Sequence, residues 1–349
     1  MKKVVVAIDS FKGCLRSAEA NRAAAAGVLE VWPDADVREV TVSDGGEGFM
    51  EAFHAATGGT LRSVQVHDPL MRKVTARYLL NGETAVIEVA EACGLWRLKP
   101  EERNPLVATS YGVGELVSDA VENGAKTIIV GLGGSGTSDA GRGMLEKVKC
   151  EMLNVKCDGI RVIIATDVEN PLCGENGAAA VYGPQKGATP EMVVELDKRA
   201  KAFAEESAKR MGFDRSEEKG AGAAGGLGYA FMQYLDAERR SGIDLLLETV
   251  GFDALVKEAD LVITGEGSAD RQTLMGKLPV GVMKHAGTTP PLLIAGKVSD
   301  RDELLRAGFV GAECINPPGL SLEEAMRPEV AKKNIEKTII NVLRKGTER

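Results

Sequence analysis

Short apolar runs recur along this chain, and helical patterns lie between several of them. Each run spans only about four to six residues, which is typical of strands in a parallel sheet that is covered on both faces. The expected strands are residues 4–8, 37–42, 127–130, 162–165, 261–264, 292–295 and 311–315. Strands that alternate with helices in this way predict an α/β fold built in layers.

Helix signals support the same fold class. The hydrophobic pattern predicts helices at residues 18–31, 114–123, 190–211, 227–235 and 325–343. Ser17 is expected to cap the first of these helices, and Pro33 follows shortly after its end.

One segment breaks the alternation of strands and helices. Residues 72–79 and 84–89 read as two strands joined by Asn81-Gly82, and Asn-Gly between such runs is the strongest short-range signal for a hairpin. An antiparallel hairpin here predicts a second domain with a mixed sheet, inserted into the first. We expect the first domain to comprise residues 1–65 and 250–349, and the inserted domain residues 66–249.

Composition argues against several classes of protein. The net charge of −8 and the pI near 5.3 disfavour nucleic acid or an anionic membrane as a partner. No apolar run approaches the ~20 residues of a membrane span, and the first apolar run reads as a strand rather than a signal peptide. The 6 cysteines form no C-x-x-C pair and only 3 histidines occur, so we expect reduced thiols, no zinc site and a cytoplasmic location.

Two glycine-rich turns that carry carboxylates follow expected strands. Asp44-Gly-Gly-Glu47-Gly48 follows residues 37–42, and Gly265-Glu266-Gly267 follows residues 261–264, with Asp270 nearby. In open α/β sheets ligands bind at this carboxyl edge, where glycines expose backbone N–H groups to anions. Carboxylates without Cys or His partners suit Mg²⁺. These turns therefore predict a site for phosphates and a divalent cation.

Hydrogen-bond donors follow two other expected strands. In Asp9-Ser10-Phe-Lys12-Gly13, Lys12 could bind a substrate carboxylate or a phosphate, although Asp9 and Ser10 could also simply cap the next helix. Residues 131–143 are rich in Gly, Ser and Thr and offer N–H and hydroxyl donors to phosphates. They do not form a Walker A sequence, and a plain flexible loop is the alternative interpretation.

Three further polar residues follow the strand at residues 162–165. Asp167 is a candidate general base or metal ligand, Asn170 could orient a substrate hydroxyl, and Lys186 could reach a phosphate. A turn-forming aspartate and a solvated lysine are the structural alternatives. Residues 220–225 match G-x-G-x-x-G, but no strand is expected before them, so we expect a loop that opens a helix rather than a dinucleotide site.

Eight segments together resemble the bacterial glycerate kinase family and run in family order over almost the whole chain. They are Asp9-Ser-Phe-Lys-Gly13, Ser43-Asp-Gly-Gly-Glu-Gly48, residues 104–115, Gly131-Leu-Gly-Gly-Ser135, Asp167-Val-Glu-Asn-Pro-Leu172, Gly183-Pro-Gln-Lys-Gly187, residues 220–228 and Ile263-Thr-Gly-Glu-Gly267. The resemblance implies a flavodoxin-like or Rossmann-like three-layer domain, split by an inserted mixed-sheet α/β domain, with the active site in the cleft between them. It also implies ATP- and Mg²⁺-dependent phosphorylation of D-glycerate, usually to 2-phosphoglycerate.

The chain departs from the family pattern in three places. After Gly-Gly-Ser the family usually has Ala-Thr-Asn-Asp-Gly-Gly-Ala-Gly, whereas residues 136–143 read Gly-Thr-Ser-Asp-Ala-Gly-Arg-Gly, so that Ser138 replaces an Asn donor. Residues 144–161 form a shorter excursion than the family has at this point. Ser268 stands where the family usually has Arg after Gly-Glu-Gly, and Arg271 is a possible substitute.

The resemblance and the motifs together assign roles to individual residues. Asp167 is the expected base, with Asp44 as the second candidate, and Lys12 also acts in catalysis. The substrate is expected to contact Asp9, Ser10, Lys12, Arg72 and Asn170; the nucleotide and its phosphates Gly133, Gly134, Ser135, Lys186 and Glu266; and Mg²⁺ Asp44 and Glu47. Lys12 and Arg72 would clamp the glycerate carboxylate.

Three other functions compete with this interpretation. The chain could phosphorylate another short hydroxy acid, or it could be a degenerate member that binds nucleotide and transfers nothing. A Rossmann oxidoreductase would depend only on the loop at residues 220–225. The expected partners are therefore ATP and a small hydroxy acid, in a monomer or a homodimer.

Overall fold

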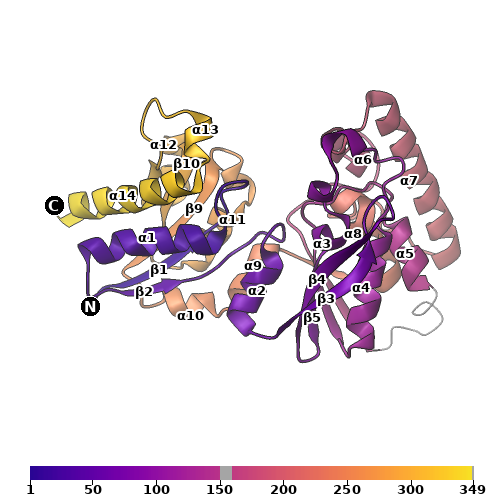
Figure 1. Cartoon of the computed structure of the whole chain (residues 1–349), viewed down its shortest axis with the longest axis horizontal. Coiled ribbons are helices and arrows are strands. Elements are labelled where there is room, and N and C mark those ends of the chain that lie inside the picture. The colour runs from indigo at the N-terminus through magenta and orange to yellow at the C-terminus, as the bar shows by residue number, and fades with distance from the viewer. Residues whose placement is uncertain (150–158, 348–349) are drawn as a thin grey trace. The chain divides into compact units, whose positions relative to one another are not determined.

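A computed structural model describes residues 1–149 and 159–347 (Figure 1). The chain divides into two compact units, one of residues 1–44 and 243–349 and the other of residues 45–242. We call them the parallel unit and the mixed unit, after their sheets. Within the described residues, no helix is long and apolar enough to cross a membrane.

The parallel unit contains a sheet of five strands that are all parallel. The strands are β1 (Lys3–Ile8), β2 (Asp36–Glu39), β9 (Leu261–Ala269), β10 (Leu292–Val298) and β11 (Gly311–Cys314). Their spatial order is β11-β10-β9-β1-β2, which is the flavodoxin-like order 2-1-3-4-5 when the unit's own strands are counted in chain order. The order reverses between β1 and β9, where Val5 pairs with Val262.

Helices cover both faces of this sheet. They are α1 (Ser17–Val31), α9 (Gly242–Thr249), α10 (Phe252–Val256), α11 (Leu278–His285), α12 (Arg301–Ala307), α13 (Leu322–Ala325) and α14 (Pro328–Thr347). Val28 and Ile339 belong to the core that α1 and α14 form with β1, whereas Val280 and Leu304 pack against β10 in a second core. Gly27 lets α1 approach α14, since a Cβ there would lie 2.7 Å from the Glu336 carbonyl oxygen.

The mixed unit contains a sheet of six strands in the order β3-β4-β5-β6-β7-β8. The strands are β3 (Thr60–His67), β4 (Lys73–Asn81), β5 (Thr84–Glu88), β6 (Thr127–Gly131), β7 (Arg161–Ala165) and β8 (Glu238–Arg240). The first three are antiparallel to one another, and β5 to β8 are parallel. The hairpin predicted at Asn81-Gly82 is confirmed, because Asn81 pairs with Thr84 across the turn.

The helices of the mixed unit are α2 (Phe49–Thr57), α3 (Val89–Cys93), α4 (Tyr111–Glu122), α5 (Arg142–Lys149), α6 (Ala178–Tyr182), α7 (Pro190–Met211) and α8 (Ala223–Leu235). The mixed unit has one large core, to which α3, α4, α5, α7 and α8 of these helices contribute. Single 3₁₀ turns occur at Leu95–Arg97, Pro100–Glu102, Pro184–Lys186 and, in the parallel unit, Thr273–Met275. The two sheets confirm the predicted α/β class, with one parallel and one mixed sheet.

Several boundaries differ from those expected. Ser17 is not the N-cap of α1, because Arg16 holds that position while the Ser17 hydroxyl donates to the Ile8 carbonyl oxygen and accepts from the Val42 N–H group. The last helix begins at Pro328 rather than residue 325, since the short α13 precedes it. Sequence analysis placed the domain boundaries after residues 65 and 249, whereas the two units divide after residues 44 and 242. The reason is that α2 packs on β4 and β5 of the mixed unit.

Candidate active site

The parallel unit gathers carboxylates at the point where its strand order reverses. Asp9 follows β1 directly, and Glu266 lies near the end of β9, which runs through Gly265-Glu266-Gly267 instead of ending before them. The Asp9 N–H group donates to the Gly265 carbonyl oxygen at 2.9 Å, so the two strand ends are joined here. This is the edge at which open α/β sheets bind ligands.

Asp9 is the most perturbed of these carboxylates. Burial raises its pKa to about 7, and the nearby charges of Asp44 and Glu266 add to the rise. The Ser10 N–H group, 2.7 Å from Asp9 Oδ1, and the Lys12 ammonium oppose it. Asp44, Glu266, Lys12 and the Ser10 N–H group therefore all act on the charge of Asp9.

Glu266 is held firmly within the sheet rather than displayed on a loop. Its side chain is buried, Oε1 accepts from the Thr273 hydroxyl at 2.6 Å, and Lys277 Nζ lies 3.3 Å from Oε2. Burial raises the pKa of Glu266, while the contacts with Thr273 and Lys277 oppose the rise. Thr273 and Lys277 therefore already stabilise a negative charge on Glu266 before any ligand binds.

In the mixed unit, glycine loops meet backbone to backbone at the carboxyl ends of β6 and β7. The Gly133 N–H group donates to the Gly45 carbonyl oxygen at 3.1 Å. A Cβ at Gly133 would lie 2.3 Å from Gly46 Cα, and a Cβ at Gly131 2.8 Å from the Gly45 carbonyl oxygen. Gly45 itself has φ +96 and lies against Ala165. Glycine is therefore required here to bring two turns together, not only to expose N–H groups.

Lys186 packs against the loop that follows β6 and donates hydrogen bonds to it. Its side chain is buried, and Nζ donates to Ser135 Oγ at 3.0 Å and to the Thr137 carbonyl oxygen at 2.6 Å. Burial lowers its pKa to about 8. The structure thus places Lys186 against the loop that contains Gly133, Gly134 and Ser135, rather than in solvent.

The other residues of the mixed unit that were predicted to act in the site lie in local environments that differ from one another. Asp167 is exposed just after β7, and Glu47 is also exposed. Asn170 connects two loops, since its amide donates to the Asn176 carbonyl oxygen at 2.8 Å and its Oδ1 accepts from Tyr182 at 2.7 Å. Arg72 lies at the β3–β4 turn, where it is ion-paired with Asp68 and Glu102 within the unit.

Two carboxylates with well-defined hydrogen-bond partners, Glu88 and Asp139, were not among the predicted site residues. Glu88 ends β5, and its Oε1 accepts from the Met50 N–H group at 2.7 Å. Burial raises the pKa of Glu88 to about 8, and the charges of Glu51 and Glu91 contribute. Asp139 accepts from the Ser110 N–H group and hydroxyl and from two glycine N–H groups at the start of α5. An aspartate shortly before a helix is the signal that could have identified Asp139.

The glycines of residues 220–225 serve packing, as expected. The residues that precede them form turns and no strand. A Cβ at Gly225 would lie 2.0 Å from the Thr137 carbonyl oxygen, and a Cβ at Gly222 2.3 Å from the Pro171 carbonyl oxygen. The loop therefore packs tightly on its neighbours at the start of α8.

No group of three or more Asp, Glu, His or Cys side chains within residues 1–149 and 159–347 is arranged to hold a metal ion. The charge of Asp44 nevertheless contributes to the raised pKa of Asp9, and a nearby cation would relieve this repulsion. Mg²⁺ often binds through only one or two carboxylates together with the phosphates of a substrate. The donor chemistry therefore fits a magnesium–nucleotide complex.

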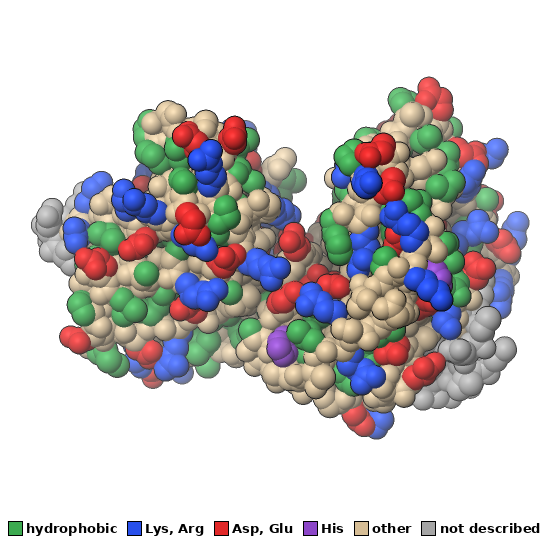
Figure 2. Space-filling model, in the orientation of Figure 1, with side chains coloured by type: hydrophobic (Ala, Val, Ile, Leu, Met, Phe, Trp, Pro, Cys, Tyr) green, Lys and Arg blue, Asp and Glu red, His purple; other side chains and the backbone are tan. Residues whose placement is uncertain are grey.

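On the face shown in Figure 2, acidic and basic side chains of the described residues intermingle, and no broad basic stripe is visible.

The departure expected at residues 144–161 falls partly outside the described structure, because residues 150–158 are not described. Ser268 is exposed near the end of β9, and Arg271 is ion-paired with Glu303.

Comparison with known proteins agrees with the motifs. The glycerate kinase family matches residues 4–156 and 145–346 of the chain. A glycerate kinase of Bacillus subtilis is 39% identical over 353 residues, which cover 93% of this chain and 92% of the relative. A glycerate 2-kinase of Escherichia coli is 40% identical over 327 residues, covering 85% and 86%. A crystal structure from Salmonella typhimurium, provisionally named glycerate kinase 2, matches with a TM-score of 0.84 at 36% identity and covers 100% of both chains.

Proposed function

The chain belongs to the glycerate kinase family, and from this premise we propose that it transfers the γ-phosphoryl group of ATP to a hydroxyl of D-glycerate, giving 2-phosphoglycerate. The observation that supports the proposal is the pair of sheet edges, one with clustered carboxylates and one with glycine-rich turns. Phosphoryl transfer needs an anion-binding backbone, charge stabilisation and a group that accepts the hydroxyl proton.

We assign the phosphate-binding role to Gly133, Gly134 and Ser135. Lys186 contributes by holding Ser135 Oγ in place, so that its effect on phosphate binding is indirect. Mg²⁺, bound by Asp44 and Glu47 and by the phosphates, would supply positive charge against the charge on the transferred group.

Asp167 is the proposed base, because its exposed carboxylate follows a strand at the carboxyl edge of the mixed sheet. Asp44 is the alternative base. Lys12, with Asp9 and Ser10, is proposed to bind the glycerate carboxylate or a phosphate, whereas the ion pairs of Arg72 with Asp68 and Glu102 make Arg72 the weaker candidate.

The test is ADP release measured with a coupled assay. The purified chain is incubated with ATP, Mg²⁺ and one acid from a panel of D-glycerate, L-glycerate, glycolate, lactate and tartronate. We expect release that depends on D-glycerate and exceeds that with the other acids. Greater release with another acid would assign a different substrate, and nucleotide binding without release would indicate a degenerate member.

A parallel incubation of the chain with D-glycerate and NAD tests the oxidoreductase alternative. We expect no change in nicotinamide absorbance, because residues 220–225 pack as a helix-opening loop with no strand before them. A cytoplasmic location remains a prediction from the sequence.

A further inference from the structure

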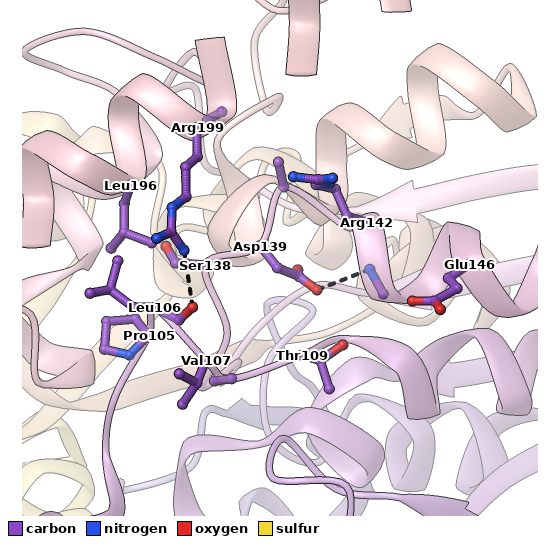
Figure 3. Close-up of a pocket in the computed structure, with 14 residues that line it drawn as sticks. Pro105, Leu106, Val107, Thr109, Ser138, Asp139, Arg142, Glu146, Leu196 and Arg199 are labelled. Atoms are coloured by element: carbon purple, nitrogen blue, oxygen red, sulfur yellow. Dashed lines mark hydrogen bonds between the residues drawn. The ribbon is translucent and has the colours of Figure 1, made fainter. Parts of the chain in front are cut away.

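The mixed unit contains a cavity of about 290 Å³ beside the start of α5 (Figure 3). Its wall is formed by residues 105–109, by the stretch 138–146 and by side chains of α7. This volume lies at the small end of the range for ligand sites. None of the residues assigned above to catalysis, substrate, nucleotide or metal lines it.

Two arginines from different helices line this cavity. Arg199 of α7 is already engaged, since its Nε donates to Glu195 Oε1 at 2.7 Å and its Nη1 to the Leu106 carbonyl oxygen at 3.2 Å. Arg142 of α5 lies 5.5 Å from the Phe203 ring centroid and has no acidic partner among the described residues. Its guanidinium therefore keeps N–H donors for a ligand.

The two acidic residues at the cavity, Asp139 and Glu146, have contacts of their own. Asp139 uses both carboxylate oxygens to accept from Ser110, Gly141 and Gly143, at distances of 2.8–3.1 Å. Glu146 is exposed and engaged with another residue. Among the described residues that line the cavity, Arg142 is therefore the one whose charged side chain has N–H donors left for an anion.

The cavity also coincides with departures of this chain from its family. Arg142 stands where the family pattern given above has alanine, and Ser138 stands where it has asparagine. Both residues line the cavity. Arg142 therefore brings a long cationic side chain to the wall of the cavity, where its guanidinium is suited to bind an anion.

We propose that this cavity is a second binding site, for a small anion with a carboxylate or phosphate group. Arg142 supplies the charge and a planar pair of N–H donors, which match such a group bidentately. Leu106 and Leu196 provide an apolar wall for the rest of the molecule. The site is separate from the proposed catalytic residues, and its occupation does not depend on the proposed function.

Isothermal titration calorimetry on the full-length chain tests this proposal, with inorganic phosphate and malonate as the two probes. The structure leads us to expect binding of at least one probe by the wild type. Arg142→Ala should weaken binding at least about tenfold, as expected for loss of a charge-assisted bidentate pair. Arg142→Lys should retain part of the affinity. Arg210→Ala removes an exposed arginine of α7 that does not line the cavity, and this variant should bind like the wild type.

A second readout separates this site from the catalytic one. With ATP and D-glycerate, the kcat and KM of Arg142→Ala should stay within about twofold of the wild type. Three results would overturn the proposal: no binding of either probe at millimolar concentration, equal binding by wild type and Arg142→Ala, or equal losses in Arg142→Ala and Arg210→Ala. A large rise in the KM for D-glycerate in Arg142→Ala would contradict a separate site, because the cavity would then belong to the substrate.

Discussion

The two units place different chemistry at the same edge of their sheets. In the parallel unit, carboxylates gather near the ends of β1 and β9, where burial raises the pKa of Asp9 and of Glu266, and the charge of Asp44 adds to the rise at Asp9. In the mixed unit, the turns at Gly45 and Gly133 touch through their backbones, with Lys186 buried behind the second turn. The edge of the parallel unit is thus characterised by charged side chains, and the edge of the mixed unit by close backbone contacts. Substitutions that alter charge or volume should therefore affect the two edges unequally.

The largest effect is expected from the candidate bases. Asp167→Asn and Asp44→Asn keep the shape of each side chain and remove its ability to accept a proton. Loss of a positioned base typically costs ~10²–10⁴-fold in rate, so the variant that lacks the true base should lose that much in kcat. Steady-state kinetics with saturating ATP and D-glycerate makes the measurement.

Asp34→Asn is the control, because Asp34 is an exposed aspartate in a turn of the parallel unit. Near-normal turnover in Asp167→Asn would remove Asp167 from the role of base. Near-normal turnover in both candidate variants would remove the assigned base chemistry from both edges.

A matched pair of glycine substitutions tests the steric side of the comparison. A Cβ at Gly133 would lie 2.3 Å from Gly46 Cα, whereas a Cβ at Gly267 would have no neighbour closer than Phe11 Cα at 4.0 Å. Neither glycine has a positive φ, so backbone strain does not separate the two. We expect Gly133→Ala to reduce the free energy of unfolding by about 1–3 kcal/mol, as overpacking does, and Gly267→Ala to change it by less than about 0.5 kcal/mol.

Urea unfolding followed by circular dichroism measures both variants. If Gly133→Ala were as stable as Gly267→Ala, the backbone contact between the two turns of the mixed unit would not exist as described.

The pH dependence of stability tests the charged edge of the parallel unit. Burial and the neighbouring Asp44 raise the pKa of Asp9 from 3.8 to about 7. Between these values the folded state binds a proton that the unfolded state has released, so this group lowers stability as pH rises through the window. From pH 5.5 to 7 the loss is about 2 kcal/mol, at ~1.4 kcal/mol per unit. Asp9→Asn should therefore gain stability over the wild type by about that much more at pH 8 than at pH 5.5.

Urea unfolding of wild type and Asp9→Asn at the two pH values makes this comparison. Lys12→Met is a useful companion, because the Lys12 ammonium opposes the raised pKa of Asp9, and its removal should enlarge the dependence. A constant difference between Asp9→Asn and wild type at both pH values would contradict the clustering of carboxylates.

The sequence predicted those parts of the fold whose signals are local. Apolar runs identified β1, β6, β7, β9, β10 and β11, and Asn81-Gly82 identified the β4–β5 hairpin, because burial on both faces and turn chemistry leave a mark in each segment. The strand β8 left no such mark, since Glu238-Arg-Arg240 is short and polar and takes its place in the sheet by pairing with β7.

For the site residues, too, the sequence predicted what a local pattern marks and missed what depends on tertiary packing. Glycine-rich turns with Asp44 and Glu266 stood out because their composition is unusual after a strand. Lys186 was predicted to reach a phosphate, with a solvated lysine as the alternative, but the sequence did not show that tertiary packing buries it against Ser135. Glu88 was read as the interior of a strand, and only the fold shows that its carboxylate meets the start of α2. Burial of a charged group depends on long-range contacts, which no local pattern records.

The most direct test of the account is ³¹P NMR of the purified chain incubated with ATP, Mg²⁺ and D-glycerate. The account predicts that the γ-phosphate resonance of ATP declines while those of ADP and one phosphomonoester appear, the latter coupled to the C2 proton of 2-phosphoglycerate. An ATP spectrum that stays unchanged, with the chain folded and nucleotide bound, would contradict the claim that these two sheet edges support phosphoryl transfer to glycerate.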